Sequence, residues 1–451
     1  MGKKDKRILI TTNHMSNFAG SEIVALEIAE AFILKGFKAD IYANYTGSPM
    51  KEEAIKSGVR LLSDEPYPNP FDYDIIWSQH HVLPILLGGN IKNGLKKPYF
   101  VYTHLSPYQP FEVVGVFSER LLADRYFLNS LEVKNAFEKF KLDDDKIVIF
   151  YNAAPVKFFD IEKQKNEKLN NIAVISNHLP EELLKAIDIC KDRYGVEFKI
   201  YGSQNQVVRI EPEHLEEVDA VISIGKSVQY AIAASRPVYC YDHFGGPGWL
   251  TLENYKLAGD MNYSGRCTNR KISAEEIAAE IISGFATAFS DINVIRDNTL
   301  QKYNLDTYVD DLIKAATERD VILKSFGEEE LAILESERNI AALIAQESRH
   351  IQDLRLIIQH IEALIHQKDG QLQEKAILIN EFEHERGKVI ETLLALDNKE
   401  RSLIGHEVTI QKEIANLMKT VSQLESTVAK MRASTSWRLT APLRKVMALF
   451  K

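Results

Sequence analysis

The residues best suited to chemistry lie in one short stretch, VYCYDHFGGPGWL, from Val238 to Leu250. Asp242 and His243 follow an apolar run typical of a buried strand, and three glycines occur in the next five positions. An imidazole beside a carboxylate can transfer a proton or donate a hydrogen bond to a phosphate. Glycines let a ligand come close to the backbone. We therefore predict a site in which Asp242 and His243 are catalytic and Gly245 and Gly246 approach a ligand. An ordinary surface loop is the alternative.

Other polar residues follow predicted strands in the same half of the chain. The apolar runs IAVIS, FKIY and AVISI each end in small or polar residues, and the last of them opens a helix. The amides at a helix N-terminus, a lysine or an arginine can bind phosphate. We predict that these residues bind an anionic ligand: Ser176, Asn177, His178, Gly202, Gly225, Lys226, Ser227, Ser264 and Arg266. The alternatives are a helix cap for Ser176 or Asn177 and a solvated side chain for Lys226.

The N-terminal half offers a second group of candidates. In TTNHMSNFAGSEIVALEIA, Gly20 and Ser21 open a helix after the first predicted strand, so their amides could face an anionic or hydroxyl-rich ligand. Glu22 could act as a base, and His104 ends the run YFVYTH. The respective alternatives are a plain turn, an exposed glutamate and a buried structural histidine. The DYD motif at 72–74 precedes a strand, which favours a turn over a metal site.

Two series of alternating strands and helices must position these residues. Short apolar runs alternate with amphipathic stretches from residue 7 to about 160, and again after the polar run DIEKQKNEKLNN at 160–171. This alternation is typical of βαβ units with a parallel sheet, which bind ligands beyond the carboxyl ends of their strands. We predict an α/β fold with two Rossmann-like domains, residues 1–160 and residues 161–326.

The order of these segments resembles that of GT-B-fold glycosyltransferases over about residues 7–320. The resemblance is carried by AGSEIVALEIAEAFILKGFKADIYA, YFVYTH, NAAPVKFF and VDAVISIGKSVQYAIAASRPVYCYD. It implies two doubly wound domains that face a cleft, with the acceptor on the side of residues 1–160 and a nucleotide-sugar donor on the side of residues 161–326. The donor would be the anionic ligand of the second domain, and Glu22 would act on the acceptor side. Transfer would need no metal or other cofactor. The resemblance also implies that His104 contacts the transferred sugar or the acceptor. The tail STSWRLTAPLRK resembles the endings of bacterial surface-polysaccharide transferases, which implies O-antigen, lipopolysaccharide or capsule assembly.

The chain departs from this family at one motif. Retaining members of the best-known group carry two glutamates separated by seven residues, and Ile222 and Tyr230 occupy these positions here. The role of that carboxylate pair and the retaining outcome therefore do not carry over, although Tyr230 stays a candidate for donor binding. The missing carboxylates keep two other functions open. One is a non-catalytic scaffold that organises other polysaccharide enzymes, and the other is a sugar-nucleotide epimerase or hydrolase.

The chain changes character after the second domain. Apolar residues recur at alternating steps of three and four, which predicts an oligomeric coiled coil over residues 327–432, interrupted near Gly370, Gly387 and Gly405. One long helix packed on the globular part is the alternative. Residues 433–451 combine basic residues with an apolar helical face, which predicts a tail that associates with an anionic membrane surface. A partner-binding tail or a frayed end of the coil is the alternative there.

The composition excludes several other classes of protein. A net charge of −9 argues against nucleic-acid binding, and three cysteines without close pairing argue against a disulfide framework or a zinc site. No apolar run has the length of a secretory signal or a membrane span. We predict a metal-independent glycosyltransferase, peripheral to the inner face of the cell membrane. It would move a sugar from a nucleotide-sugar to a growing, lipid-linked bacterial surface glycan.

Overall fold

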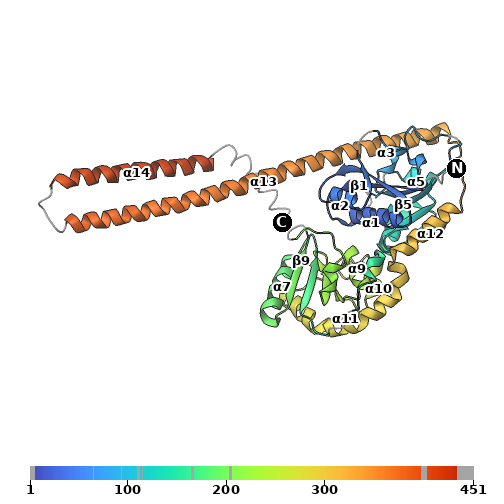
Figure 1. Ribbon diagram of the computed structural model, residues 1–451, viewed down its shortest axis with the longest axis horizontal. Helices are drawn as coiled ribbons and strands as arrows, with labels where there is room; N and C mark the ends of the chain where they lie inside the picture. The colour runs from blue at the N-terminus through green and yellow to red at the C-terminus, as the bar shows by residue number, and fades with distance from the viewer. Residues whose placement is uncertain are drawn as a thin grey trace. The chain divides into compact units, whose positions relative to one another are not determined.

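The computed structural model describes residues 6–63, 66–92, 94–108, 112–113, 115–163, 167–202, 206–397 and 404–433 (Figure 1). Contacts divide the chain into a globular unit, Met1–Arg349, and a helical unit, His350–Lys451. The globular unit contains two sheets, each covered by helices, as the alternation of apolar runs predicts.

The N-terminal domain is built on a seven-stranded sheet in the order β3-β2-β1-β4-β5-β6-β7, and all of its strand pairs are parallel. The strands are β1 (Arg7–Met15), β2 (Lys38–Thr46), β3 (Arg60–Leu62), β4 (Ile75–Gln79), β5 (Tyr99–His104), β6 (Arg125–Leu128) and β7 (Ile147–Ile149). The strand order reverses between β1 and β4. Doubly wound folds bind ligands at such a point, outside the carboxyl ends of the strands.

Helices cover both faces of this sheet. One apolar cluster joins Ile8 and Ile10 of β1 to α1 (Gly20–Leu34), α2 (Met50–Lys56) and α12 (Leu305–Thr317). A second cluster joins Leu9, on the opposite face, to α3 (Leu83–Leu87), α5 (Val116–Leu122) and the first turns of α13 (Glu328–Asp397). Because α3 has only five residues, α13 completes the cover of this face, with Ala341 and Ala345 fully buried against it.

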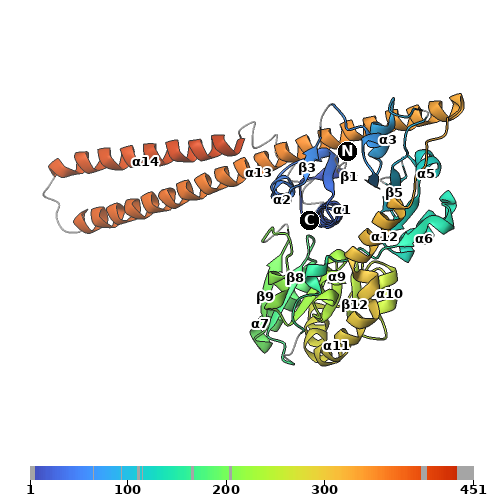
Figure 2. The ribbon, with the colours of Figure 1, turned by 45° about the vertical axis from the view of Figure 1, so that its right-hand side comes forward.

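The C-terminal domain has a five-stranded sheet in the order β12-β11-β10-β8-β9, in which only β12 is antiparallel to its neighbour. The strands are β8 (Asn171–Ile175), β9 (Glu197–Tyr201), β10 (Ala220–Ser223), β11 (Val238–Asp242) and β12 (Gly245–Trp249). The helices of this domain are α7 (Glu181–Tyr194), α8 (Glu213–Glu216), α9 (Lys226–Ala233), α10 (Tyr255–Asp260) and α11 (Ala274–Tyr303). Figure 2 shows this domain below the N-terminal one.

Short helices occupy the remaining connections. α6 (Leu131–Phe137) follows β6 directly. The 3-10 turns are η1 (Pro70–Asp72), η2 (Glu138–Phe140), η3 (Asp144–Lys146) and η4 (Val156–Phe158). In the DYD segment, the Asp74 carboxylate accepts a hydrogen bond from the backbone N–H of Arg7 at 2.8 Å. This contact ties the segment to the start of β1, and η1 ends at the first aspartate of the motif.

The chain crosses between the domains twice, and the two crossings lie side by side. The N–H of Ala154 donates to the carbonyl of Tyr303 at 2.7 Å, and the N–H of Leu305 donates to the carbonyl of Ala154 at 2.9 Å. After the second crossing, α12 packs into the core of the N-terminal domain. The C-terminal domain therefore ends near Tyr303 instead of residue 326, and the globular unit continues to Arg349 instead of ending at 326.

Among the described residues, α11 is long and apolar enough to cross a membrane by length and composition alone. Its Ile277, Ile281 and Phe285 lie in the core of the C-terminal domain, and the helix packs against α7 and β12. These contacts are those of a helix that covers a sheet.

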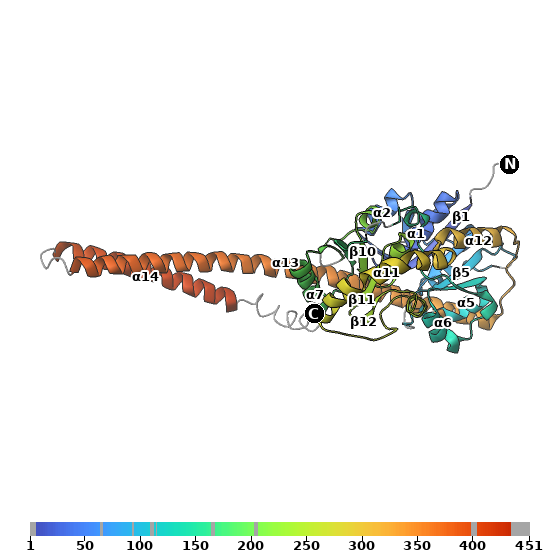
Figure 3. The ribbon, with the colours of Figure 1, turned by 90° about the horizontal axis from the view of Figure 1, so that it is seen from below.

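The helical unit consists of the rest of α13 and α14 (Ile404–Ala433), which lie beside each other in Figures 1, 2 and 3. α13 runs through Gly370 and Gly387 without a break, so the predicted interruptions there are wrong. A glycine inside a helix costs only about 1 kcal/mol, which a long helix can bear. On α14, Val421 is buried and Ile414, Leu417 and Leu424 are half-buried, at the predicted spacing. Self-association stays a prediction, and the basic tail after Ala433 lies outside the described residues.

Candidate functional site

Predicted residues of the C-terminal domain gather where β8 and β11 end. The Ser176 hydroxyl donates to the Asp242 carboxylate at 3.0 Å, and the backbone N–H of His243 donates to the same carboxylate at 2.7 Å. The backbone N–H of His178 donates to Ser176 Oγ, and the rings of His178 and His243 lie 5.9 Å apart. Asp242 is buried, whereas 43% of the His243 side chain is exposed. Two imidazoles thus border solvent beside an oriented carboxylate. We call these residues the donor-side cluster: Ser176, His178, Asp242 and His243.

Two other predicted residues frame the donor-side cluster. Asn177 lies between two of its members, and Gly202, at the end of β9, packs so closely on the Ser176 carbonyl that a Cβ atom would collide with it. The parallel register of β8 with β9 and β10 brings these strand ends together. This grouping follows from the polarity of the strands, which the sequence pattern indicated.

The structure gives a different role to the glycines at 245 and 246. They form β12, an antiparallel strand paired with β11, and both are buried. A Cβ atom at Gly245 would collide with the carbonyl of Arg270, and one at Gly246 would collide with the carbonyl of Cys240. The chain's own backbone therefore explains why glycine is needed at these two positions, and ligand contact with Gly245 and Gly246 stays a prediction.

Lys226 and Tyr230 lie in the joint between the two domains. Lys226 Nζ is 2.8 Å from the buried carboxylate of Glu27 on α1 and donates to the carbonyls of Asn152 and Ala153. Tyr230 is also buried and its hydroxyl donates to Glu27. Gly225, with a positive φ of 63°, and Ser227 flank the lysine at the start of α9. In this conformation the Lys226 charge is neutralised by protein groups, which differs from the predicted contact with phosphate.

Arg266 also bridges the two domains. Its guanidinium donates to both carboxylate oxygens of Glu132, at 2.9 and 2.7 Å. Glu132 lies in the first turn of α6, directly after β6, so this ion pair connects the carboxyl edge of the N-terminal sheet to the C-terminal domain. The neighbouring Ser264 is buried, and its hydroxyl has no hydrogen-bond partner among the described residues.

His104 is enclosed by protein at the end of β5. Its Nε2 lies 3.2 Å from the Glu119 carboxylate and its Nδ1 lies 3.6 Å from that of Glu112, and all three residues are buried. Burial by itself would lower the pKa of His104, but the two glutamates outweigh it and raise the pKa to about 10. A charged imidazole between two carboxylates matches the alternative of a buried structural histidine.

His80 is a candidate that the sequence analysis missed. It follows β4 and has a positive φ of 59°, an uncommon conformation for a residue other than glycine that is concentrated at functional sites. Its Nδ1 lies 3.2 Å from the backbone N–H of Asn13 and 3.3 Å from Thr12 Oγ1, both near the end of β1. Desolvation lowers the pKa of His80, which favours the neutral ring. The signal for it was its place in SQHH, directly after an apolar strand.

Glu22 organises the loop between β1 and α1. Its carboxylate accepts hydrogen bonds from the backbone N–H groups of Ser16 at 3.2 Å and Asn17 at 3.1 Å, and the residue is buried. Burial raises the pKa of Glu22 despite these bonds. Gly20 is exposed, with open space where a Cβ atom would lie, and Ser21 is half-buried beside it. The backbone at Gly20 is therefore accessible at the start of α1, and Glu22 fixes the backbone of the preceding loop.

Unpaired polar atoms mark the carboxyl edge of the N-terminal sheet. Asn44 on β2 and Thr103 on β5 are 1% and 2% exposed, yet Asn44 Oδ1 and Thr103 Oγ1 have no hydrogen-bond partner among the described residues. Buried polar atoms in proteins are nearly always paired. Together with Asn13 and His80, these residues make the edge polar where the strand order reverses. We call this group the acceptor-side edge: Asn13, Asn44, His80 and Thr103.

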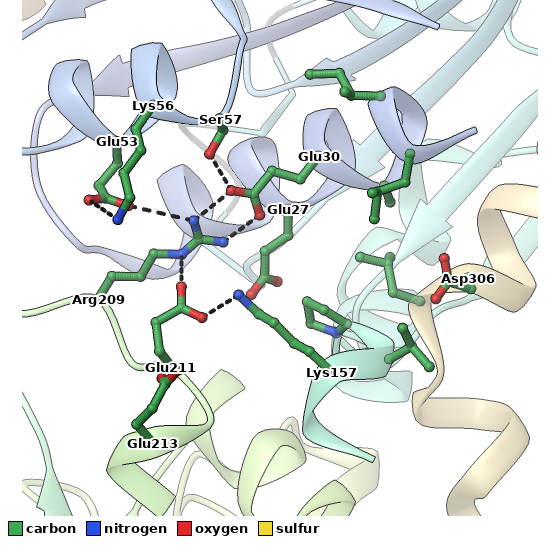
Figure 4. A pocket seen from close by; sticks show the side chains of 16 residues that line it. Glu27, Glu30, Glu53, Lys56, Ser57, Lys157, Arg209, Glu211, Glu213 and Asp306 are labelled. Carbon is green, nitrogen blue, oxygen red and sulfur yellow. Dashed lines mark hydrogen bonds and ion pairs between the residues drawn. The ribbon is translucent and has the colours of Figure 1, made fainter. Parts of the chain in front are cut away.

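A cavity of about 640 Å³ lies elsewhere on the joint between the domains (Figure 4). Its wall follows α1 from Glu27 to Leu34, away from the start of that helix, and none of the predicted site residues lines it. Arg209 donates to both oxygens of Glu30, at 2.6 and 2.5 Å, and its Nε lies 3.2 Å from Glu211. These charged groups pair with one another, and the Arg209–Glu30 pair connects the two domains beside the cavity.

No protein-family profile matches the chain, and no curated protein sequence is significantly similar to it. Among solved structures, it is similar to Anabaena HepE in complex with UDP-glucose, with a TM-score of 0.48 and 14% identity over 69% of this chain and 100% of that chain. It is also similar to a glycosyltransferase from Rickettsia africae, with a TM-score of 0.44 and 13% identity over 70% and 99% of the respective chains. For the lipopolysaccharide outer core galactosyltransferase WaaB these values are 0.34, 12%, 64% and 98%.

Proposed function

We propose that this chain transfers a glycosyl group from a nucleotide-sugar to a hydroxyl of a glycan acceptor. The observation that carries the proposal is that each of the two sheets carries a group of polar side chains where its strands end. The donor-side cluster lies where the parallel strands β8 and β11 of one sheet end, and the acceptor-side edge lies where strands of the other sheet end. The Arg266–Glu132 ion pair joins the two domains at these edges. Doubly wound sheets bind their ligands there, and a transferase must hold two polar substrates at once.

The donor-side residues suggest how a departing nucleotide would be held. Lys226 and Arg266 are already paired with Glu27 and Glu132, so the exposed imidazole of His243 is the better candidate for contact with a phosphate. The Asp242 carboxylate accepts the backbone N–H of His243, which fixes the backbone position from which the His243 side chain extends. A hydrogen bond from the ring to the leaving phosphate would stabilise the charge that develops there. We also propose that the transfer proceeds without a metal ion.

The cellular setting is proposed from the sequence. The basic, amphipathic residues after 432 support attachment to the inner face of a membrane, and the heptad spacing in α13 and α14 supports a homo-oligomer. An acceptor at such a surface is a lipid-linked glycan, as in O-antigen, lipopolysaccharide or capsule assembly.

A donor screen tests the proposal. Nucleotide-sugars are added to the full chain one at a time, beginning with UDP-glucose, and the melting temperature is recorded. A bound donor at 100 times its dissociation constant stabilises the fold by about 2.7 kcal/mol. We expect at least one donor to raise the melting temperature, and His243→Ala to reduce that rise, whereas His384→Ala on the exposed surface of α13 leaves it unchanged.

Product analysis separates the proposal from its rivals. We expect the nucleotide to be released only when a glycan acceptor is added. Release without an acceptor would indicate a hydrolase, and isomerised donor would indicate an epimerase. If no nucleotide-sugar changes the melting temperature, glycosyl transfer is the wrong function for this chain.

A further inference from the structure

Helix α13 brings one side chain to the carboxyl end of β1. Ser348 Oγ lies 3.0 Å from Asn13 Nδ2 and 3.3 Å from His14 Nε2, although 335 positions separate Ser348 from Asn13 in the sequence. Asn13 is buried and belongs to the acceptor-side edge, where its backbone N–H donates to His80 Nδ1. The long helix therefore contacts the candidate site directly.

The hydrogen bonds of these residues indicate where each proton lies. Asn13 Oδ1 accepts from the amide of Asn44 at 2.9 Å, and Asn13 Nδ2 donates to Ser348 Oγ. The Ser348 proton can then go to His14 Nε2 at 3.3 Å or to Asn13 Oδ1 at 3.4 Å. Because Asn13 Oδ1 already accepts from Asn44, we assign the Ser348 proton to His14 Nε2, which also lies 3.4 Å from Asn13 Nδ2. His14 Nε2 then accepts, and in the neutral ring the proton lies on Nδ1.

The docking of α13 fixes the position of this serine. Ala341 and Ala345 are fully buried against the N-terminal domain. The Glu337 carboxylate accepts the backbone N–H groups of Phe117 at 2.7 Å and Ser118 at 3.0 Å, at the start of α5. Ser348 lies about 16 Å further along the helix, at 1.5 Å per residue. Burial and a charged helix cap therefore set the register at which Ser348 meets β1.

We propose that Ser348 is a positioning residue of the acceptor site. It holds the Asn13 amide and the His14 ring in one orientation, so that the acceptor-side edge is complete only when α13 is docked. This inference rests on the proposed glycosyl transfer and extends it, because it makes the helix a condition for binding a hydroxyl-rich acceptor.

Three variants of the full chain test this role. Ser348→Thr keeps the hydroxyl, Ser348→Val has the shape of threonine without it, and Ser336→Val changes an exposed serine on the same helix. We expect Ser348→Val to lower kcat/KM for the acceptor on the order of 10-fold, the loss of a hydrogen bond that orients a reacting group. Ser348→Thr and Ser336→Val should stay close to the parent chain. The rise in melting temperature caused by the donor should be the same in all.

A second measurement needs no activity. Hydrogen–deuterium exchange of the backbone over residues 12–20 should be faster in Ser348→Val than in Ser348→Thr, with equal exchange in the sheet of the C-terminal domain. If the parent chain transfers no sugar but this difference is present, the transferase proposal fails and the positioning contact stands. If the valine and threonine variants agree in both exchange and acceptor kinetics, the role of Ser348 is overturned.

Discussion

Removing the docked part of α13 should destabilise the N-terminal domain severely. The change is a chain that ends at Phe326, compared with one that ends at Gln352 and keeps all the helix turns on the domain. Leu334, Ala341 and Ala345 are 8%, 0% and 0% exposed in the intact chain. Ala341 and Ala345 belong to the apolar cluster that covers one face of the seven-stranded sheet together with the short helix α3.

The size of this effect follows from the buried groups. Burial of one leucine contributes about 1.5–3 kcal/mol and each alanine methyl about 0.8 kcal/mol, so these three side chains contribute about 3–5 kcal/mol. The uncovered surface of α3, including Leu83 and Leu86, loses a similar amount, and the two hydrogen bonds to Glu337 add about 2 kcal/mol. The sum of about 8–12 kcal/mol is comparable to the whole stability of a domain, about 5–15 kcal/mol.

Urea unfolding followed by tryptophan fluorescence, together with binding of a hydrophobic dye, measures the loss. Trp77 lies on β4 of the affected sheet, so its signal reports on this domain. We expect the shorter chain to bind dye without denaturant and to lose the cooperative transition of Trp77. A shorter chain that unfolds at the same urea concentration and with the same slope as the longer one would refute the reasoning.

Three further predictions concern single contacts. The folded-state pKa of His104, about 10, lies above its ordinary value of 6.5, so the stability that charged His104 contributes is complete below about pH 6.5 and is lost as the pH rises towards 10. Urea unfolding across this range should show that His104→Gln removes this decline in stability. An identical decline in the variant would exclude the ion pairs of His104 as its cause. Gly246→Ala should lower the melting temperature because its Cβ would collide with the Cys240 carbonyl, whereas Gly20→Ala, with open space, should not; equal melting temperatures would contradict the packing of β12. Arg266→Ala and Glu132→Ala should show a coupling of about 1 kcal/mol in a double-mutant cycle of urea unfolding, and strictly additive effects would mean that the pair does not join the domains in solution.

Strand-end positions were predictable from the sequence, because periodicity locates the strands and parallel pairing brings their carboxyl ends to one edge. Ser176, His178, Asp242 and His243 therefore meet as expected. The same reasoning could have found His80, which follows an apolar strand.

Contacts between distant segments were not predictable in this way. Nothing local in the sequence indicates that Glu27 would neutralise Lys226, or that Arg270 would fill the space beside Gly245. The heptad pattern of α13 likewise did not show that its first turns belong to the globular unit, because a buried stripe of alanines can face a partner helix or a sheet equally well. Such choices are made by tertiary packing.

The paired crossings at Ala154 and Leu305 have a consequence for motion. A single connecting segment would let one domain rotate about the other in any direction. Two connecting segments held together by backbone hydrogen bonds resist twisting, so bending is the easier movement. The paired crossings then form a hinge between the two domains of the globular unit. Ligands would enter by a rotation about one axis. The ion pairs Arg266–Glu132 and Arg209–Glu30 would hold the two domains together, and salt would weaken the more exposed Arg266 pair more than the Arg209 pair.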